Sequence, residues 1–239
     1  MNELSDKETL RYSRHLLLEE VGLEGQLTLK TSTVAVVGAG GLGSPVLLYL
    51  AAAGIGTLIL IDDDEVELSN LQRQVLYKIN HLGQNKVAAA GKVLASLNNQ
   101  IEIVTHCQKL DESNAAYMLK GADIVLDCSD NFSTRYSVNR YCITNKTPLI
   151  SGAALATKGQ LMGYGCVFPQ SEATPVINCS NAGVISPLLG VLGSMQAQLT
   201  LNLLLGHAEG GVFITFHALT LKQQHFKVIK DLECKECGK

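Results

Sequence analysis

Short apolar runs alternate with longer amphipathic segments through residues 31–152. The apolar runs predict buried strands over 34–37, 57–61, 101–106, 122–128 and 148–151. The segments of helical period predict helices over 44–53, 84–98, 112–119 and 133–145. Because strand and helix signals alternate, we expect an α/β fold built on a doubly wound, mainly parallel sheet.

The first predicted strand ends in a glycine-rich turn, Gly38-Ala39-Gly40-Gly41-Leu42-Gly43, which fits the pattern G-x-G-x-x-G. A strand, a glycine turn and a helix in this order let the backbone approach a phosphate, and the helix amino terminus favours an anion. Asp62 follows the second strand, about 20 residues past the turn, where dinucleotide folds place the acid that binds the ribose. These features predict a nucleotide site in a Rossmann-like core.

The alternation ends after Gly152. The later pattern predicts a strand over 159–168 and a polar loop over 170–181. It then predicts a buried helix over 184–206 and an antiparallel hairpin made of 212–217 and 224–229. A helix is also expected over 5–20, before the first strand. We expect a single domain over 1–239, made of an N-terminal helical arm (1–30), the nucleotide-binding core (31–152) and a part continued by antiparallel strands (153–239).

Composition limits the kinds of partner and the cellular compartment that we expect for the chain. A formal net charge of −3 gives no reason to expect nucleic acid or a membrane surface as partner. The polar start lacks the apolar core of a signal peptide, and no run reaches the roughly 18 apolar residues of a membrane span. Seven cysteines, an odd number, argue against a fully paired secreted framework. We expect a cytoplasmic protein.

Polar side chains suited to phosphate chemistry lie before the first predicted strand and in the segments between the later ones. Four of them can donate hydrogen bonds to anionic oxygens: Arg14, Asn70, Arg73 and Lys86. Asp130 follows the fourth strand and is a hard oxygen ligand suited to Mg²⁺. Nucleotidyl transfer needs cationic donors with a metal carboxylate, whereas hydride transfer does not. If these residues converge, they favour nucleotidyl transfer over the NAD chemistry that the glycine turn alone suggests.

Several segments in order resemble the ThiF/MoeB/HesA family, bacterial relatives of the ubiquitin-activating enzymes. They are RYSRHLLLEEVGLEGQ, VVGAGGLGSPVLLYLAAAGIGTLILID, LSNLQRQVLY, the helix-opening Lys86, LDCSDN, TPLISGAA and AGVISPLLGVLGSMQA. The likeness covers nearly the whole chain. GAGGLG is weakly specific alone, whereas SNLQRQ and DCSDN in this order are highly specific.

The resemblance implies an adenylyltransferase that uses ATP and Mg²⁺ to activate the C-terminal glycine carboxylate of a small ubiquitin-fold sulfur carrier ending in Gly-Gly, releasing pyrophosphate. It implies a homodimer, with Arg14 reaching the nucleotide of the partner subunit, and a carrier-binding part with a crossover loop over 153–239. Asp62 would hold the ribose, and Asp130 would hold Mg²⁺. The nucleotide-binding residues implied are Gly38, Gly40, Gly41, Leu42, Gly43, Asp62, Asp64, Asn70, Arg73, Gln74, Lys86, Asp130 and Asn131.

The cysteines leave two questions open. Cys234 and Cys237 form C-x-x-C, which is half of a tetrahedral zinc site. By the resemblance a second C-x-x-C supplies the other half, but Gly163 replaces its first cysteine and leaves Cys166. Zinc then needs a fourth ligand from elsewhere, or binds weakly or not at all. Cys179 resembles the family's loop thiol, which can form an acyl link to the carrier; a redundant exposed thiol is the alternative.

The identity of the carrier also stays open. LDCSDN and GQLM favour a ThiF-like enzyme and a ThiS-like carrier in thiamine thiazole synthesis, which we prefer slightly. LSDKE and SGAA favour a MoeB-like enzyme and a MoaD-like carrier in molybdopterin synthesis, with the adenylate passed to a separate sulfurtransferase. The alternatives are a related tRNA threonylcarbamoyladenosine-cyclising enzyme, which the net charge disfavours, an NAD-dependent oxidoreductase, and a nucleotide-binding module without catalysis.

Overall fold

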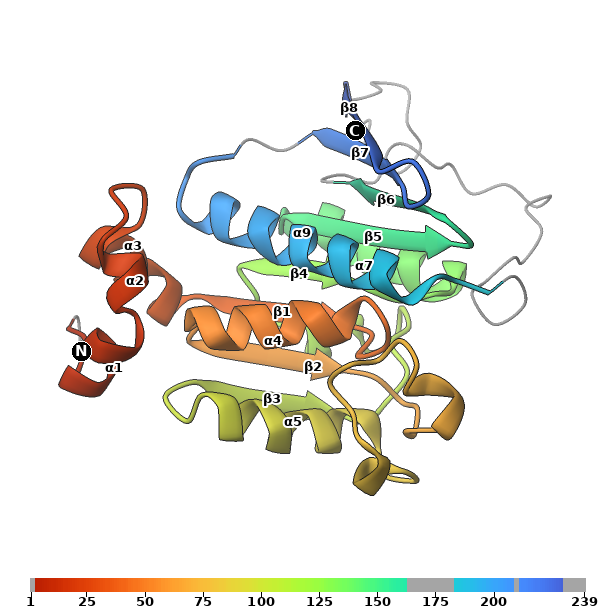
Figure 1. Cartoon of the computed structure of the whole chain (residues 1–239), viewed down its shortest axis with the longest axis horizontal. Helices are drawn as coiled ribbons and strands as arrows, with labels where there is room; N and C mark the ends of the chain where they lie inside the picture. The colour runs from red at the N-terminus through yellow and green to blue at the C-terminus, as the bar shows by residue number, and fades with distance from the viewer. Residues whose placement is uncertain (1–2, 163–182, 209–210, 230–239) are drawn as a thin grey trace.

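The computed structural model describes residues 3–162, 183–208 and 211–229. One eight-stranded sheet runs through them in the order β3-β2-β1-β4-β5-β6-β7-β8 (Figure 1). The first five strands in this order are parallel: β1 (Thr33–Val37), β2 (Thr57–Ile61), β3 (Glu102–His106), β4 (Ile124–Asp127) and β5 (Leu149–Leu155). The last three pair antiparallel: β6 (Lys158–Met162), β7 (Val212–His217) and β8 (Lys222–Lys227). The predicted α/β fold, a mainly parallel sheet continued by antiparallel strands, is confirmed.

Helices cover both faces of the parallel strands. Side chains alternate along β1, so Val34 and Val36 pack into one apolar cluster while Ala35 and Val37 pack into another. The first cluster includes the helices α4 (Gly43–Ala53), α5 (Lys86–Leu97) and α9 (Ser186–Leu204). The second includes α6 (Ala115–Met118) and α7 (Phe132–Asn145). Among the described residues, no helix is long and apolar enough to cross a membrane.

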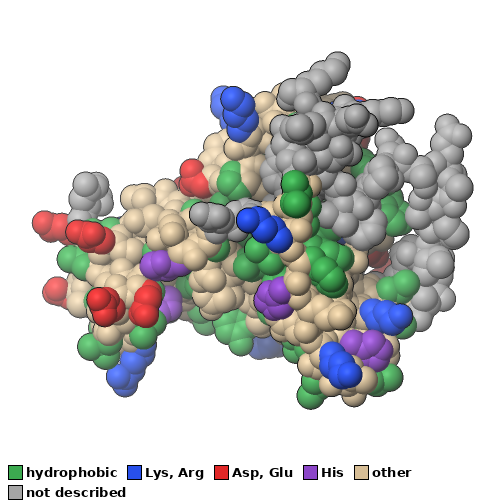
Figure 2. All heavy atoms as spheres, turned by 90° about the horizontal axis from the view of Figure 1, so that it is seen from above, with side chains coloured by type: hydrophobic (Ala, Val, Ile, Leu, Met, Phe, Trp, Pro, Cys, Tyr) green, Lys and Arg blue, Asp and Glu red, His purple; other side chains and the backbone are tan. Residues whose placement is uncertain are grey.

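The N-terminal arm differs from the single helix predicted over 5–20. It contains three helices, α1 (Asp6–Arg11), α2 (Ser13–Leu16) and α3 (Gly22–Thr31). The break falls at Tyr12, because its ring is buried and its hydroxyl accepts a hydrogen bond of 2.9 Å from the side chain of Asn98, the residue that ends α5. Figure 2 shows acidic side chains gathered over this arm, at the left end of the molecule.

The C-terminal strands also differ in extent from the prediction. β5 continues past residue 151 to Leu155, where it turns directly into β6. β8 begins at Lys222 rather than at residue 224, because Leu221 adopts a positive φ of 55° in a tight turn after β7. The later part of the strand predicted over 159–168 lies outside the described residues. Two short 3-10 helices, η1 (Leu68–Asn70) and η2 (Ile79–His81), were not predicted.

Close backbone packing at Gly43 generates a stability prediction. A Cβ atom at Gly43 would lie 2.0 Å from the carbonyl oxygen of Gly38, so the backbone must move to accept it. We expect Gly43→Ala to lower the free energy of unfolding by about 2 kcal/mol, measured by urea unfolding. Gly190→Ala is the matched control, because a Cβ at Gly190 in α9 meets nothing within 4 Å and alanine favours the helix. Equal stability of the two variants would contradict the prediction.

Candidate functional site

A cavity of about 1300 Å³ lies at the carboxyl ends of the parallel strands and extends over the antiparallel strands β6 to β8. Most of the residues predicted to bind the nucleotide line it: Gly38, Gly40, Gly41, Leu42, Asp62, Asp64, Asn70, Arg73, Gln74, Lys86, Asp130 and Asn131. Two predicted residues, Arg14 and Gly43, do not line it. The cysteines Cys166, Cys179, Cys234 and Cys237 lie outside the described residues, so the predicted zinc site and loop thiol stay predictions.

The glycines of the turn serve different purposes. Gly38 has a φ of +95°, and a Cβ there would lie 2.8 Å from the carbonyl oxygen of Cys128. A Cβ at Gly41 would lie 2.5 Å from the side chain of Leu189 on α9. A Cβ at Gly40, in contrast, would meet only Gln74, at an ordinary 3.6 Å. Since the protein itself leaves room at Gly40, the missing side chain there keeps the backbone open to the cavity.

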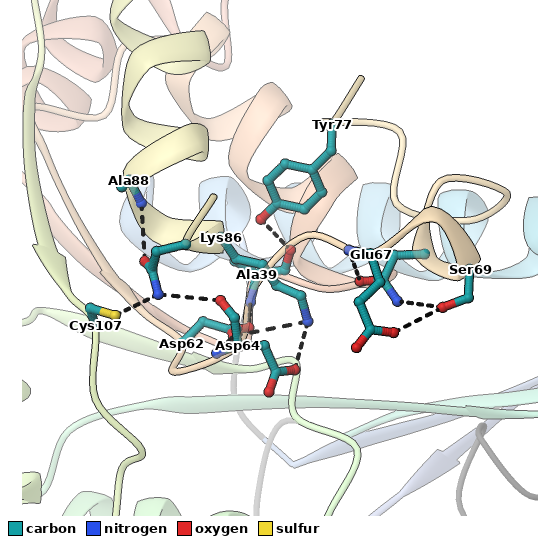
Figure 3. Close-up of polar contacts among 11 residues, drawn as sticks. Ala39, Asp62, Asp64, Glu67, Ser69, Tyr77, Lys86, Ala88 and Cys107 are labelled. Carbon is teal, nitrogen blue, oxygen red and sulfur yellow. Dashed lines mark hydrogen bonds and ion pairs between the residues drawn. The ribbon is translucent and has the colours of Figure 1, made fainter. Parts of the chain in front are cut away.

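Asp62 ties the end of β2 to the glycine turn (Figure 3). One carboxylate oxygen accepts a hydrogen bond of 2.8 Å from the N–H of Ala39, and the other accepts one of 2.9 Å from the N–H of Asp64. From the other side, the Tyr77 hydroxyl donates to the carbonyl oxygen of Ala39 at 2.8 Å. Burial raises the pKa of the Asp62 carboxyl above its ordinary value, although the neighbouring Lys86 ammonium opposes the rise.

Lys86 is a buried cation held between two carboxylates. Its ammonium lies 2.7 Å from Asp64 Oδ2 and 4.0 Å from Asp62 Oδ1, and only 6% of its side chain is exposed. The lysine begins α5, where the helix dipole disfavours a positive charge, and the two carboxylates offset that cost. The sequence placed Lys86 at a helix start and Asp62 and Asp64 after a strand, but their pairing appears only in the structure.

The segment after β2 brings three more predicted residues to the cavity. The side chain of Asn70 accepts a hydrogen bond from the N–H of Glu67, and Arg73 donates to the carbonyl oxygen of Ser69 at 2.8 Å. Gln74 is buried, and its side-chain oxygen has no hydrogen-bond partner within the described part of the chain. An unpaired buried acceptor is costly, so Gln74 is an unusual residue in the wall of the cavity.

The end of β4 carries Asp130 and Asn131 into the cavity. Asp130 is exposed, as a metal-binding carboxylate in an open site has to be. The side chain of Asn131 caps α7 by accepting a hydrogen bond of 2.9 Å from the N–H of Thr134, which sequence reasoning did not anticipate.

Two further cavity residues, Asp127 and Arg135, were missed. Asp127 lies inside an apolar run that predicts a strand, and its side chain is buried. The signal available in the sequence was that a carboxylate in a buried strand needs partners.

Arg14 lies apart from this cavity. It is an exposed residue of α2, in the arm beside the amino ends of the parallel strands, whereas the cavity lies at their carboxyl ends (Figure 1). Within one chain, the structure therefore does not bring Arg14 together with the other predicted residues. Its predicted role requires the partner subunit of a homodimer, and that role stays a prediction.

The sheet order, with a glycine turn and an acidic residue at the ends of adjacent parallel strands, defines a Rossmann-like α/β protein. A model of the ThiF family matches residues 12–238, and the chain belongs to this family, which confirms the resemblance found in the sequence.

Curated relatives are similar over most of this chain. An adenylyltransferase and sulfurtransferase MOCS3 from Aedes aegypti is 46% identical over 217 residues, covering 87% of this chain and 50% of the relative. The chain therefore spans about half the length of this relative. A molybdopterin-synthase adenylyltransferase from Salmonella typhimurium is 40% identical over 252 residues, covering 100% of both chains.

Solved structures share the fold. E. coli MccB with ATP has a TM-score of 0.81 and 24% identity, covering 96% of this chain and 75% of that one. PaaA has a TM-score of 0.79 and 23% identity, covering 97% of this chain and 76% of that one. At this level of identity the likeness concerns the fold alone.

The Lys86 pair generates a prediction of pH dependence. Lys86→Met removes the ammonium that opposes the raised pKa of Asp62, so that pKa moves further above its value in the unfolded chain. The folded state then prefers the protonated carboxyl, and the variant loses stability relative to wild type as the pH rises from about 4 to 7. We expect a deficit on the order of 3 kcal/mol at neutral pH and a smaller one near pH 4.5, measured by urea unfolding.

The control is Lys92→Met, which removes an exposed lysine from the same helix. Its effect on the free energy of unfolding should be small and independent of pH. A deficit of Lys86→Met that stays constant between acidic and neutral pH would contradict the predicted coupling to Asp62.

Proposed function

We propose that this chain is an ATP-dependent adenylyltransferase, which joins the C-terminal glycine carboxylate of a small ubiquitin-fold sulfur carrier to AMP and releases pyrophosphate. The observation that carries the proposal is the end-to-end similarity, at 40% identity, to a molybdopterin-synthase adenylyltransferase. The cavity supports it independently, because donors suited to phosphate and a carboxylate suited to magnesium line the same space.

The residues present fit ATP. Gly40 leaves the backbone open beside the amide nitrogen of Gln74, and the helix α4 begins at Gly43, the last residue of the glycine turn. The two carboxylate oxygens of Asp62 accept one backbone hydrogen bond each, so each retains a lone pair for a ribose hydroxyl. By this arrangement Asp62 orients the ribose, and the turn holds the phosphates.

The donor set also fits Mg²⁺. The exposed carboxylate of Asp130 offers a hard oxygen ligand in the cavity, and Asp62, Asp63 and Asp64 bring carboxylate oxygens within 4.8 Å of one another. When bound, Mg²⁺ supplies neutralisation of the phosphate charge. Asp130 would hold the ion, as the sequence predicts.

For this reaction the protein must position the reactants and stabilise negative charge, and it needs no general base. A carboxylate oxygen of the carrier, already ionised at neutral pH, forms a bond to the α-phosphorus, and the bond from that phosphorus to the β-phosphate oxygen breaks. Negative charge grows on the α-phosphate oxygens as this happens. Asn70, Arg73 and Lys86 are the donors in the cavity that offset it.

The cavity offers a route for the carrier. It continues from the glycine turn along β5 and β6 to the hairpin of β7 and β8, which gives an extended tail ending in Gly-Gly space to reach the nucleotide. The name of the Salmonella typhimurium relative favours a molybdopterin carrier over the thiamine carrier that LDCSDN and GQLM suggested. A sulfurtransferase as a further partner stays a prediction.

Exchange of labelled pyrophosphate into ATP tests the proposed function. We expect exchange in the presence of a molybdopterin-pathway carrier ending in Gly-Gly, and no exchange without a carrier. Asp130→Ala should abolish exchange while its unfolding transition matches that of wild type, because Asp130 is exposed and contributes little to packing. Exchange with a thiamine-pathway carrier alone would correct the carrier assignment. No exchange with any carrier would overturn the proposal.

A homodimer completes the site in this proposal. The arm exposes Leu10 by 79% and Leu17 by 75%, which supports an interface there, since large apolar side chains favour contact with another surface. Arg14 lies between them in the sequence, and its proposed role requires that the arm of one subunit dock beside the cavity of its partner.

Subunit mixing tests the role of Arg14. Arg14→Ala and Asp130→Ala should each be inactive alone. In a mixed dimer, the subunit that retains Asp130 receives an intact Arg14 from its partner, so one site in two is complete. After random mixing we expect about a quarter of the wild-type exchange activity. Recovery of no activity would show that Arg14 does not act across subunits.

A further inference from the structure

The buried carboxylate of Asp127 ends β4 three residues before Asp130. It is 1% exposed, and one of its oxygens accepts hydrogen bonds from the N–H and the hydroxyl of Ser129, at 3.0 and 2.6 Å. The other oxygen accepts one of 2.7 Å from the hydroxyl of Ser151, on the neighbouring strand β5. Asp127 thus joins the start of the loop that carries Asp130 to the next strand of the sheet.

Arg135 binds the same two elements from α7. Its guanidinium donates to the carbonyl oxygen of Ser129 and, at 2.8 Å, to the carbonyl oxygen of Gly152 on β5. It also donates to the Ser151 hydroxyl at 3.3 Å and lies 3.7 Å from Asp127 Oδ2. The planar fork of arginine reaches the loop and the strand at once, which a lysine ammonium cannot reproduce.

Gln196 holds the same strand ends from α9, on the opposite face of the sheet. It is fully buried, and its amide donates to the carbonyl oxygens of Asp127, at 3.2 Å, and Ile150, at 3.4 Å. A Cβ at Gly152 would lie 2.5 Å from its side-chain oxygen, so the glutamine fits only because position 152 is glycine. The ends of β4 and β5 are therefore fixed from both faces.

This polar network has a free-energy cost of burial that an apolar core would not have. Burying the Asp127 carboxylate beside a guanidinium of which 18% of the side chain is exposed costs more than apolar residues of the same size would, so stability alone does not favour the pair. A polar network with satisfied partners instead fixes one geometry. What it fixes here is the backbone at Ser129, directly before Asp130, while Asn131 directly after Asp130 is held by its cap on α7.

We infer that Asp127 and Arg135 are positioning residues, which hold the turn from Ser129 to Asn131 so that the carboxylate of Asp130 faces the cavity as a magnesium ligand. The inference rests on the proposed function, because that function gives Asp130 its metal. In this inference neither Asp127 nor Arg135 contacts ATP. Their loss should weaken the magnesium-dependent part of nucleotide binding and leave the remainder intact.

Titration calorimetry of ATP with the purified protein, in excess Mg²⁺ and in EDTA, tests this inference without a carrier. We expect Asp127→Asn and Arg135→Gln to raise the Kd for ATP about tenfold or more in Mg²⁺, and to leave the Kd in EDTA nearly unchanged. Raising the Mg²⁺ concentration should recover part of the loss. Arg135→Lys should not rescue, because it keeps the charge and loses the fork.

Arg140→Gln is the matched control, because Arg140 lies on the exposed side of α7 and pairs there with Glu112. It should leave both Kd values unchanged. Ser151→Ala removes one hydrogen bond from Asp127 without removing a charge, and should show the same magnesium effect in a milder form even if the charge variants fail to fold.

The possible results distinguish failure of this inference from failure of the proposed function. Equal weakening in Mg²⁺ and in EDTA across the variants, with lowered unfolding midpoints, would show a structural role only and overturn the inference. Unchanged Mg²⁺ dependence would also overturn it, with the proposed function intact if wild type still catalyses exchange. If wild type binds ATP with the expected Mg²⁺ effects but catalyses no exchange with any carrier, the proposed function fails and the inference about Asp130 stands.

Discussion

The contact between backbones at the glycine turn constrains the rest of this structure. Gly38 rests against the backbone after β4, and Gly43 rests against Gly38, so strand β1, helix α4 and the end of β4 approach more closely than side chains would allow. Parallel pairing of β1 with β2, with Val37 opposite Ile61, brings Asp62 within a hydrogen bond of Ala39. The strand pairing and the close approach at the turn together set the positions of the acid, the turn and the start of the loop that carries Asp130.

The charges of the site form a balanced group. Three acidic side chains in succession follow β2, and burial of the first would be unfavourable without the lysine that begins α5. A phosphate entering this space meets a cation that is already paired and carboxylates that repel it. Positive charge from a metal ion would have a clear electrostatic use beside these three carboxylates, which face a single ammonium among the described residues, that of Lys86.

The local pattern of the sequence was sufficient for the sheet and insufficient for the contacts between distant segments. Buried parallel strands are apolar runs, so β1 and β2 could be read directly, and Asp62 could be placed after them. The break at Tyr12 could not be read, because it depends on Asn98, a residue distant in the sequence. Asp127 was missed for the same reason: its partners arrive from β5 and α7, and no local period reports them.

Helix α5 links the two ends of the molecule. Lys86, the first residue of the helix, lies in the cavity. Asn98, which ends the helix about 18 Å further along its axis, donates a hydrogen bond to the hydroxyl of Tyr12 in the arm. Arg11 adds a hydrogen bond to the carbonyl oxygen of Leu97 at the same end. Under the proposed function, a partner subunit bound at the arm would contact one end of the helix whose other end carries Lys86, so subunit assembly and the cavity would be linked through α5.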